Sequence, residues 1–155
     1  NKSMAQRRHH KWVPLLAVAA LIAVNWTGFK GSIYGLLPAR PAAELPDWRT
    51  DYQGALNEAR ATGKPILVDF TADWCPPCRV MEREVWPDAA VREALNGSTV
   101  PLQLDVDRDS TQTLVRRMQV GSIPTVLLLD SEGNEIDRRG LLSRSQMLDF
   151  LEAFR

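Results

Sequence analysis

Cysteine is scarce in this sequence: the 155 residues include two, and both lie in the segment 74–78, Trp-Cys-Pro-Pro-Cys. A framework of several structural disulfides is therefore excluded. Histidine is equally scarce, and His9 and His10 lie far along the chain from the cysteines. Because a structural zinc site needs about four ligands, the two cysteines lack a second pair to complete one. We expect neither a metal nor another cofactor.

The sequence also lacks a net charge, since Lys plus Arg and Asp plus Glu both number 19. The charges are unevenly placed: residues 1–11 contain basic residues and no acid, whereas the chain from Trp48 onward has 13 basic and 17 acidic residues. This acidic excess argues against a nucleic-acid-binding surface in the second part. No internal repeat is present, and 45% apolar residues suffice for one globular domain with a short appendage.

Charge is absent altogether from residues 12–29, a mostly apolar stretch with Trp12 and Trp26 near its ends. A helix of this length would be roughly 27 Å long, which is enough to cross a bilayer, and tryptophan is typical of the membrane interface. The alternative is a cleaved signal peptide, but residues 25–27, Asn-Trp-Thr, make a poor cleavage site. We therefore predict an uncleaved transmembrane anchor over residues 12–29.

The basic tail 1–11 in front of this span predicts that the N-terminus stays in the cytoplasm and that the rest of the chain is exported. Residues 30–47 are rich in Gly and Pro without a clear periodicity, as is typical of a linker. Residues 48–155 then form the globular domain. We expect a single-pass protein of the inner (cytoplasmic) membrane whose domain lies in the periplasm or outside the cell.

Hydrophobic periodicity in the domain predicts the order helix, strand, helix, strand, helix, strand, strand, helix. Capping boxes are predicted at Asp109 with Gln112 and at Ser143 with Gln146. This order implies an α/β fold, with a central mixed sheet covered by helices on both faces. The predicted helices are 51–62, a motif helix from 76 that breaks near 86–87 and continues from Asp88 to about Leu95, one from Asp109 to Met118 and one from Ser143 to Phe154; the predicted strands are 66–70, 100–106, 125–129 and 135–139.

Redox chemistry is predicted for the two cysteines, because thiols separated by two residues at a strand–helix junction can close a small disulfide ring. Pro76 and Pro77 suit the first positions of a helix, where a missing N–H costs little. The positive end of that helix would stabilise a thiolate at Cys75, which makes Cys75 the candidate nucleophile. We expect Cys78, one turn further in, to be more shielded and to act as the resolving thiol.

These residues resemble the thioredoxin family over about residues 48–155. The resemblance rests on the segment 68–78, Val-Asp-Phe-Thr-Ala-Asp-Trp-Cys-Pro-Pro-Cys, on Ile123-Pro124-Thr125, and on Gly140 before the last helix. It implies the thioredoxin fold and a redox-active disulfide between Cys75 and Cys78.

The resemblance also assigns catalytic roles to Asp69 and Pro124. Asp69 matches the buried acid that assists proton transfer when the second cysteine attacks, and burial is expected to raise its pKa. An acid at a strand end that faces solvent is the alternative. Pro124 matches the family's cis-proline beside the disulfide, although most X–Pro bonds are trans.

Three further residues are expected to contact substrate: Trp74, which matches the aromatic that shields the site, Pro76 and Ile123. A core position for Trp74 is equally compatible with the sequence. Met81 and Trp86 are expected to be core residues, because apolar residues at that spacing on a helix are usually buried. The sequence departs from the family at Gln103, where thioredoxins often have a lysine beside the acid, and at Pro76, where cytosolic members usually have glycine.

Within the family, residues 72–75, Glu82 and residues 85–88 look most like the C-terminal periplasmic domain of the thiol reductase DsbD and related membrane-tethered thioredoxins. This resemblance implies an enzyme, a membrane-anchored thiol–disulfide oxidoreductase that reduces disulfides of exported proteins. Its expected partners are those proteins and a membrane electron-donor protein, and it is expected to be a monomer that binds no nucleic acid.

Other functions stay open at this point. The same dithiol can serve as an oxidant or an isomerase of exported proteins. A C-x-x-C pair can also hold copper(I), and a domain of this fold can act as a holdase through its surface alone. The two cysteines, Asp69 and Pro124 together argue against the holdase, and the redox enzyme is the leading hypothesis.

Overall fold

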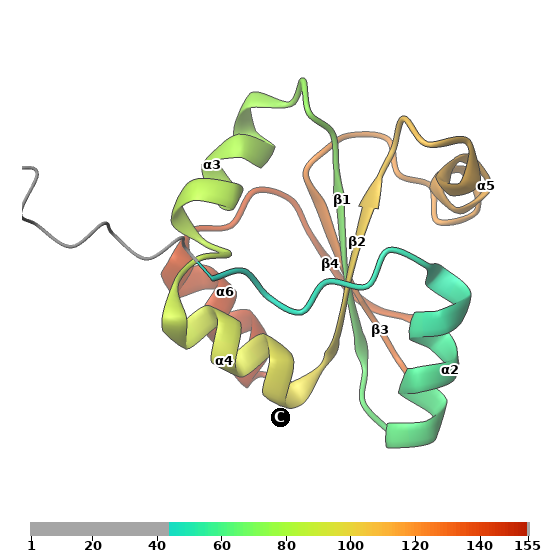
Figure 1. The fold of residues 1–155 in the computed structure, drawn as a ribbon, viewed down its shortest axis with the longest axis horizontal. Coiled ribbons are helices and arrows are strands. Elements are labelled where there is room, and N and C mark those ends of the chain that lie inside the picture. The colour runs from blue at the N-terminus through green and yellow to red at the C-terminus, as the bar shows by residue number, and fades with distance from the viewer. Residues whose placement is uncertain (1–43, 155) are drawn as a thin grey trace, which may run out of the picture. The chain divides into compact units, whose positions relative to one another are not determined.

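The computed structural model describes residues 44–154, which are built around a four-stranded mixed sheet of order β2-β1-β3-β4 (Figure 1). The central strand β1 pairs in parallel with β2 and antiparallel with β3, and β3 pairs antiparallel with β4. The mixed sheet predicted from the order of elements is therefore confirmed. The strands are β1 (Ile66–Thr71), β2 (Val100–Asp105), β3 (Thr125–Leu129) and β4 (Glu135–Arg139).

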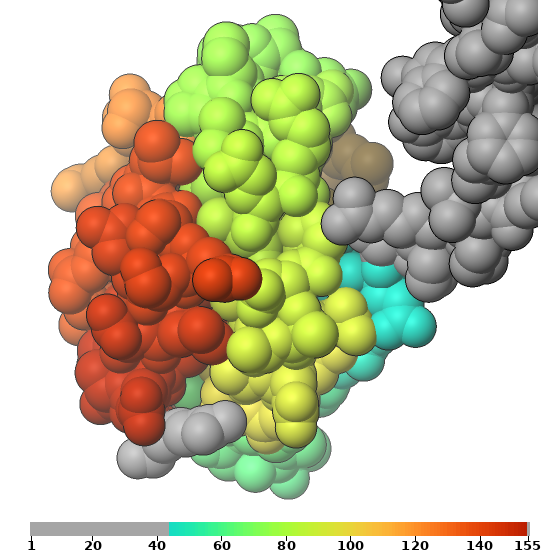
Figure 2. Space-filling view, turned by 90° about the vertical axis from the view of Figure 1, so that its left-hand side faces the viewer, coloured from blue at the N-terminus to red at the C-terminus, as the bar shows by residue number. Residues whose placement is uncertain are grey.

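Helices cover both faces of the sheet, as predicted. Side chains alternate along β1, so Ile66 and Val68 enter one hydrophobic cluster and Leu67 enters the other. The first cluster lies under α2 and α5, and the second lies under α3, α4 and α6. Figure 2 shows the outer surface of these last three helices. The helices are α2 (Tyr52–Thr62), α3 (Pro76–Glu84), α4 (Ala89–Ser98), α5 (Asp109–Arg117) and α6 (Arg144–Glu152).

Local sequence explains most of the helix ends. Asp51 caps α2 by accepting a hydrogen bond from the Gly54 N–H, and Gly63 ends the helix in a left-handed conformation with φ of 70°. The predicted break near residues 86–87 is confirmed, because Asp88 caps α4 through the N–H groups of its first turn. Met81 and Trp86, each 1% exposed, are core residues as expected.

One predicted capping box is confirmed and the other is wrong. Ser143 and Gln146 exchange both hydrogen bonds of a capping box at the start of α6. At α5 the N-cap residue is Arg108 and makes no side-chain cap, so Asp109 is already the first helical residue. The Gln112 amide donates instead to the Val106 carbonyl. The loop before the helix therefore sets where α5 begins.

The segment before α2 lies along the domain. Arg49 forms an isolated parallel bridge with Leu102 and an ion pair with Glu58, and Trp48 packs edge-on against Trp86 at 5.1 Å between ring centroids. Within residues 44–154 no helix is long and apolar enough to cross a membrane. The predicted anchor 12–29, like the tail before it and most of the linker after it, lies outside the described residues.

Candidate active site

The two cysteines form a disulfide at the start of α3, with 5.3 Å between their Cα atoms. Cys75 is the N-cap residue, and its Sγ accepts a hydrogen bond from the Cys78 N–H at 3.3 Å. The expectation that Cys78 is more shielded than Cys75 is wrong for this oxidised form, since the residues are 3% and 2% exposed. Ring closure places both sulfurs against the same cluster of side chains, so neither thiol is favoured by exposure.

Pro76 and Pro77 occupy the first positions of α3, as predicted. Neither proline has an N–H to lose there, so the helix starts directly after Cys75. A sulfur in the N-cap position faces the positive end of the helix, where an anionic side chain is stabilised. The backbone therefore favours a thiolate at Cys75 once the disulfide is reduced.

Asp69 is a buried acid, as expected, and the solvent-facing alternative is excluded because its exposure is 2%. It lies in the middle of β1, in register with Gln103 of β2, whose side-chain Nε2 donates to Asp69 Oδ2 at 3.0 Å. Burial raises the Asp69 pKa to about 6; the Gln103 hydrogen bond lowers it in part, and the nearby Glu82 charge adds to the rise. Asp69 can therefore take up or release a proton near neutral pH.

The Ile123–Pro124 peptide bond is cis, as the resemblance implies. Ile123 packs against the cluster formed by Ala72 and the two cysteines, so the loop before β3 lies at the disulfide. Pro124 is buried at the start of β3. The structure thus brings the second motif of the sequence, more than forty residues away, to the first.

Trp74 is 64% exposed, which excludes the alternative of a core tryptophan. Its indole Nε1–H donates to Asp107 Oδ2 at 2.7 Å. Pro76 is exposed as well, and Val106 packs beside Ile123 against the cysteines. Sequence reasoning missed Val106 and Asp107. A topological signal for both existed, because the carboxyl ends of the parallel strands β1 and β2 meet at one edge of the sheet.

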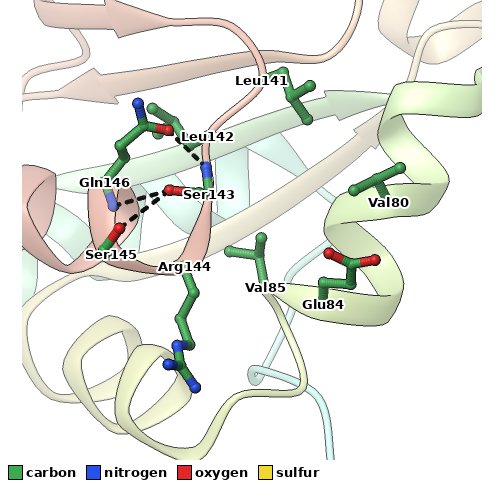
Figure 3. A pocket seen from close by; sticks show the side chains of 9 residues that line it. All are labelled: Val80, Glu84, Val85, Leu141, Leu142, Ser143, Arg144, Ser145 and Gln146. Atoms are coloured by element: carbon green, nitrogen blue, oxygen red, sulfur yellow. Dashed lines mark hydrogen bonds between the residues drawn. The ribbon is translucent and has the colours of Figure 1, made fainter.

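A groove of about 580 Å³ opens between α3 and the first turn of α6 (Figure 3). Val80 and Leu141 face it from its two sides, with Glu84 and Arg144 among the polar side chains that line it. Leu141 is 53% exposed and follows Gly140, whose backbone lies against Pro124: a Cβ there would be 3.8 Å from the Pro124 carbonyl oxygen. The groove therefore begins next to the cis-proline loop.

Comparison with known proteins agrees with this geometry. Residues 52–155 match the family described as "Thioredoxin-like domain". A solved thioredoxin from Thermus thermophilus is 30% identical, with a TM-score of 0.63 over 71% of this chain and 87% of its own. The chain belongs to the thioredoxin-like family. With its Cys75–Cys78 disulfide it is a thioredoxin-like thiol–disulfide oxidoreductase.

The resemblance to DsbD is also supported. "Thiol:disulfide interchange protein DsbD" of Yersinia pestis (strain Pestoides F) is 32% identical over 96% of this chain, which covers 27% of that protein. The reduced C-terminal domain of Neisseria meningitidis DsbD has the same fold, with 24% identity and a TM-score of 0.58 over 66% of this chain and 93% of its own. The chain thus spans about a quarter of the length of its curated DsbD relative.

Proposed function

We propose that this thioredoxin-like protein is a membrane-anchored reductase, which reduces disulfides of exported proteins through Cys75 and Cys78. The observation that carries the proposal is the disulfide at the N-terminus of α3, with Cys75 in the N-cap position. The homology to DsbD, a thiol:disulfide interchange protein, supports exchange with other protein thiols. The uncharged stretch 12–29 supports the anchor, and the basic tail before it supports a domain outside the cytoplasm.

In the proposed reaction the Cys75 thiolate attacks a substrate disulfide, which forms a mixed disulfide and releases one substrate thiolate. Cys78 then loses its proton and attacks the Cys75 sulfur. The bond between Cys75 and the substrate breaks, the Cys75–Cys78 disulfide forms, and the second substrate thiolate leaves and takes a proton from water. Two electrons pass to the substrate, so a dithiol donor, which we assign to a membrane protein, must reduce Cys75–Cys78 again.

We assign the proton of Cys78 to Asp69. Its pKa of about 6, raised chiefly by burial, leaves most of the carboxylate unprotonated at pH 7 but close enough in pKa to accept a proton. Asp69 lies on β1, six residues before Cys75, which is the N-cap residue of α3. Burial supports this role of Asp69 in resolving the mixed disulfide, because an exposed acid would exchange its proton with water.

Substrate contact is assigned to the surface around the disulfide. Trp74 and Pro76 are exposed on either side of Cys75, and Ile123 packs against the cysteine cluster. The backbone beside Pro124 is proposed to pair with the extended substrate chain. An exposed aromatic side chain beside a disulfide supplies apolar contact area without a large loss of side-chain freedom.

Trapping tests the order of the two cysteines. In Cys78→Ser the mixed disulfide on Cys75 cannot be resolved, so a protein substrate should stay attached and appear in non-reducing mass spectrometry as a higher-mass adduct. Cys75→Ser is the matched control and should trap nothing. The reversed pattern would show that Cys78 is the nucleophile and would refute the assignment.

Topology is tested on the full chain. Protease added to spheroplasts should remove the domain and leave a membrane fragment that contains residues 12–29. A soluble mature form that begins after residue 26 would show instead that the segment is a cleaved signal peptide.

A further inference from the structure

The loop between α5 and β3, residues 118–124, which lies at the disulfide, is held by a side chain at each end. At the end nearer the disulfide, the Thr125 hydroxyl donates to the Ser122 carbonyl at 2.6 Å. At the other end, Met118 is the C-cap residue of α5, and its carbonyl accepts a 2.7 Å hydrogen bond from Arg138 Nη2. Carbonyls at the end of a helix lack partners within the helix, so this contact supplies one from outside.

Arg138 is placed and oriented to hold this helix end. It lies on β4 in register with Leu127 of β3, whose side chain belongs to the cluster on the face that α5 covers. Glu135 fixes the guanidinium of Arg138 through two hydrogen bonds of 2.8 and 2.6 Å, and a pair with two such bonds sets the orientation of the group. A positive charge is also favourable at the negative end of the helix dipole.

The residue that follows the helix depends on such support. Gln119 has a φ of 52°, in the left-handed region that residues with a side chain rarely adopt. A conformation of this kind persists where its neighbours hold it. The Gln119 carbonyl lies 3.5 Å from Arg138 Nη1, and the next N–H, that of Val120, donates back to the Val115 carbonyl at 2.9 Å. The turn that directs the chain from α5 towards the disulfide is therefore held from β4.

We infer that Arg138 is a positioning residue: from β4 it fixes the turn at the end of α5 and, through that turn, the loop 118–124 on which a protein substrate docks. The inference rests on the proposed function, because it assumes that substrate docks against the backbone beside Pro124. Gly140, two residues after Arg138, lies against the Pro124 carbonyl. The strand and the residue after it thus contact both ends of the loop.

The expected size of the effect follows from the fraction of molecules whose loop is ready to bind. If loss of the Arg138 contact leaves the loop in its binding conformation in about a tenth to a third of the molecules, KM rises about threefold to tenfold. The Cys75 thiolate depends instead on the N-terminus of α3. A small disulfide reagent, which needs the thiolate but not the loop, should therefore react at nearly the wild-type rate.

The test compares kcat and KM for insulin disulfides with the rate at which the reduced protein reacts with 5,5′-dithiobis(2-nitrobenzoate). Arg138→Met should raise KM about threefold to tenfold and leave kcat and the small-reagent rate within about twofold. Arg138→Lys keeps the charge and a donor and should recover most of the loss. Arg139→Met is the matched control, because Arg139 pairs with Asp137 and lies over the Phe150 ring on the other face of the sheet. It makes the same change in charge and should match the wild type.

Amide hydrogen exchange locates the change in the structure. The Val120 N–H, which closes the turn after α5, should exchange faster with water in Arg138→Met but not in Arg139→Met. The Leu127 N–H, in the middle of β3, is the internal reference, because its exchange reports opening of the sheet. A general loss of stability would raise both rates, whereas loss of the Arg138 contact should raise the Val120 rate alone.

Four results would overturn the inference. An unchanged KM in Arg138→Met would show that the contact does not serve docking, and an equal rise in Arg139→Met would indicate a long-range effect of charge. Equal losses for insulin and the small reagent would indicate a change at the cysteines. A Val120 exchange rate that rises no more than that of Leu127 would indicate a loss of overall stability.

Failure of the proposed function has a different signature. A wild-type protein that reduces neither probe, while Val120 exchange still responds to Arg138→Met and not to Arg139→Met, would refute the proposed function and the docking role with it. The contact between Arg138 and the end of α5 would stand.

Discussion

The two faces of the sheet share the same strands but differ in what they bury. The face under α2 and α5 holds a continuous hydrophobic cluster that includes Ile66, Val68 and Leu127. On the other face Asp69 follows Leu67 at the strand spacing of two, and it is the one charged side chain buried among the described residues. Both faces bury hydrophobic side chains, but one of them also buries an ionisable acid, which costs stability when the acid is charged.

The largest effect on stability is expected from a substitution in the hydrophobic cluster under α2 and α5. Leu127 is fully buried in the middle of β3, so Leu127→Ala should lower the free energy of unfolding by about 2–5 kcal/mol through lost burial and a cavity. Urea denaturation measures this loss. The reduction potential of Cys75–Cys78 should change by less than about 30 mV, which is about 1.4 kcal/mol. A larger change would show that the two faces are not separable.

The second prediction concerns the acid on the other face. Because the Asp69 pKa is raised from 3.8 to about 6, the folded protein binds its proton more tightly than the unfolded chain does. This stabilisation is fully present below about pH 4 and is lost as pH rises through about 6, by about 3 kcal/mol at roughly 1.4 kcal/mol per pKa unit.

Asp69→Asn cannot titrate, so its stability should fall less than that of the wild type between pH 4 and pH 7, and at pH 7 it should be the more stable protein. Urea denaturation across this range measures the difference. The same substitution should slow resolution of the mixed disulfide more than its formation. Parallel stability profiles for the two proteins would contradict a raised pKa, and equal slowing of both steps would remove Asp69 from the mechanism.

A smaller effect is expected when Gln103, the hydrogen-bond partner of Asp69, is replaced. Its amide stabilises the Asp69 carboxylate through the 3.0 Å hydrogen bond, so Gln103→Met should raise the Asp69 pKa further above its ordinary value. Carboxyl ¹³C chemical shifts against pH measure this pKa. Gln53→Met, on the surface of α2, is the control. A pKa that stays the same or falls would mean that the amide does not support the carboxylate.

The smallest effect is confined to one helix end. Ser143→Ala removes the side-chain cap of α6 and should cost about 1 kcal/mol in the free energy of unfolding. Ser110→Ala, an exposed serine that does not cap a helix, should cost less. The reduction potential should stay at the wild-type value in both variants, because a changed cap does not alter the disulfide. A shifted potential in Ser143→Ala alone would link α6 to the redox site.

Local sequence patterns correctly predicted features that depend on residues close together in the chain, such as a helix cap and a helix break. The Ser143–Gln146 box and the break before Asp88 depend on residues within a few positions of one another, and both are present. The capping box predicted at Asp109 and Gln112 has the same spacing as the one at Ser143 and Gln146, but it does not form. The Gln112 amide donates instead to the Val106 carbonyl in the loop before α5.

Contacts over long sequence separations lay beyond such patterns. The partner of Trp74 is Asp107, 33 residues later, and the register of β1 with β2 places Gln103 beside Asp69. Family resemblance pointed to Asp69, to Gln103 as its neighbour and to the cis bond at Pro124, none of which follows from composition or periodicity. The near-equal burial of Cys75 and Cys78 in the oxidised form was not predicted, because it depends on ring closure against Val106 and Ile123.

The most direct test of the reductase claim is the reduction potential of the Cys75–Cys78 pair, measured by equilibration with glutathione redox buffers. The motif has Pro77 before its second cysteine and no histidine between the two, so no added positive charge stabilises the reduced thiolate. We predict a potential below about −200 mV, on the side of thioredoxin at about −270 mV. A value near about −120 mV, that of the oxidant DsbA, would contradict the reductase and leave an oxidant of exported proteins in its place.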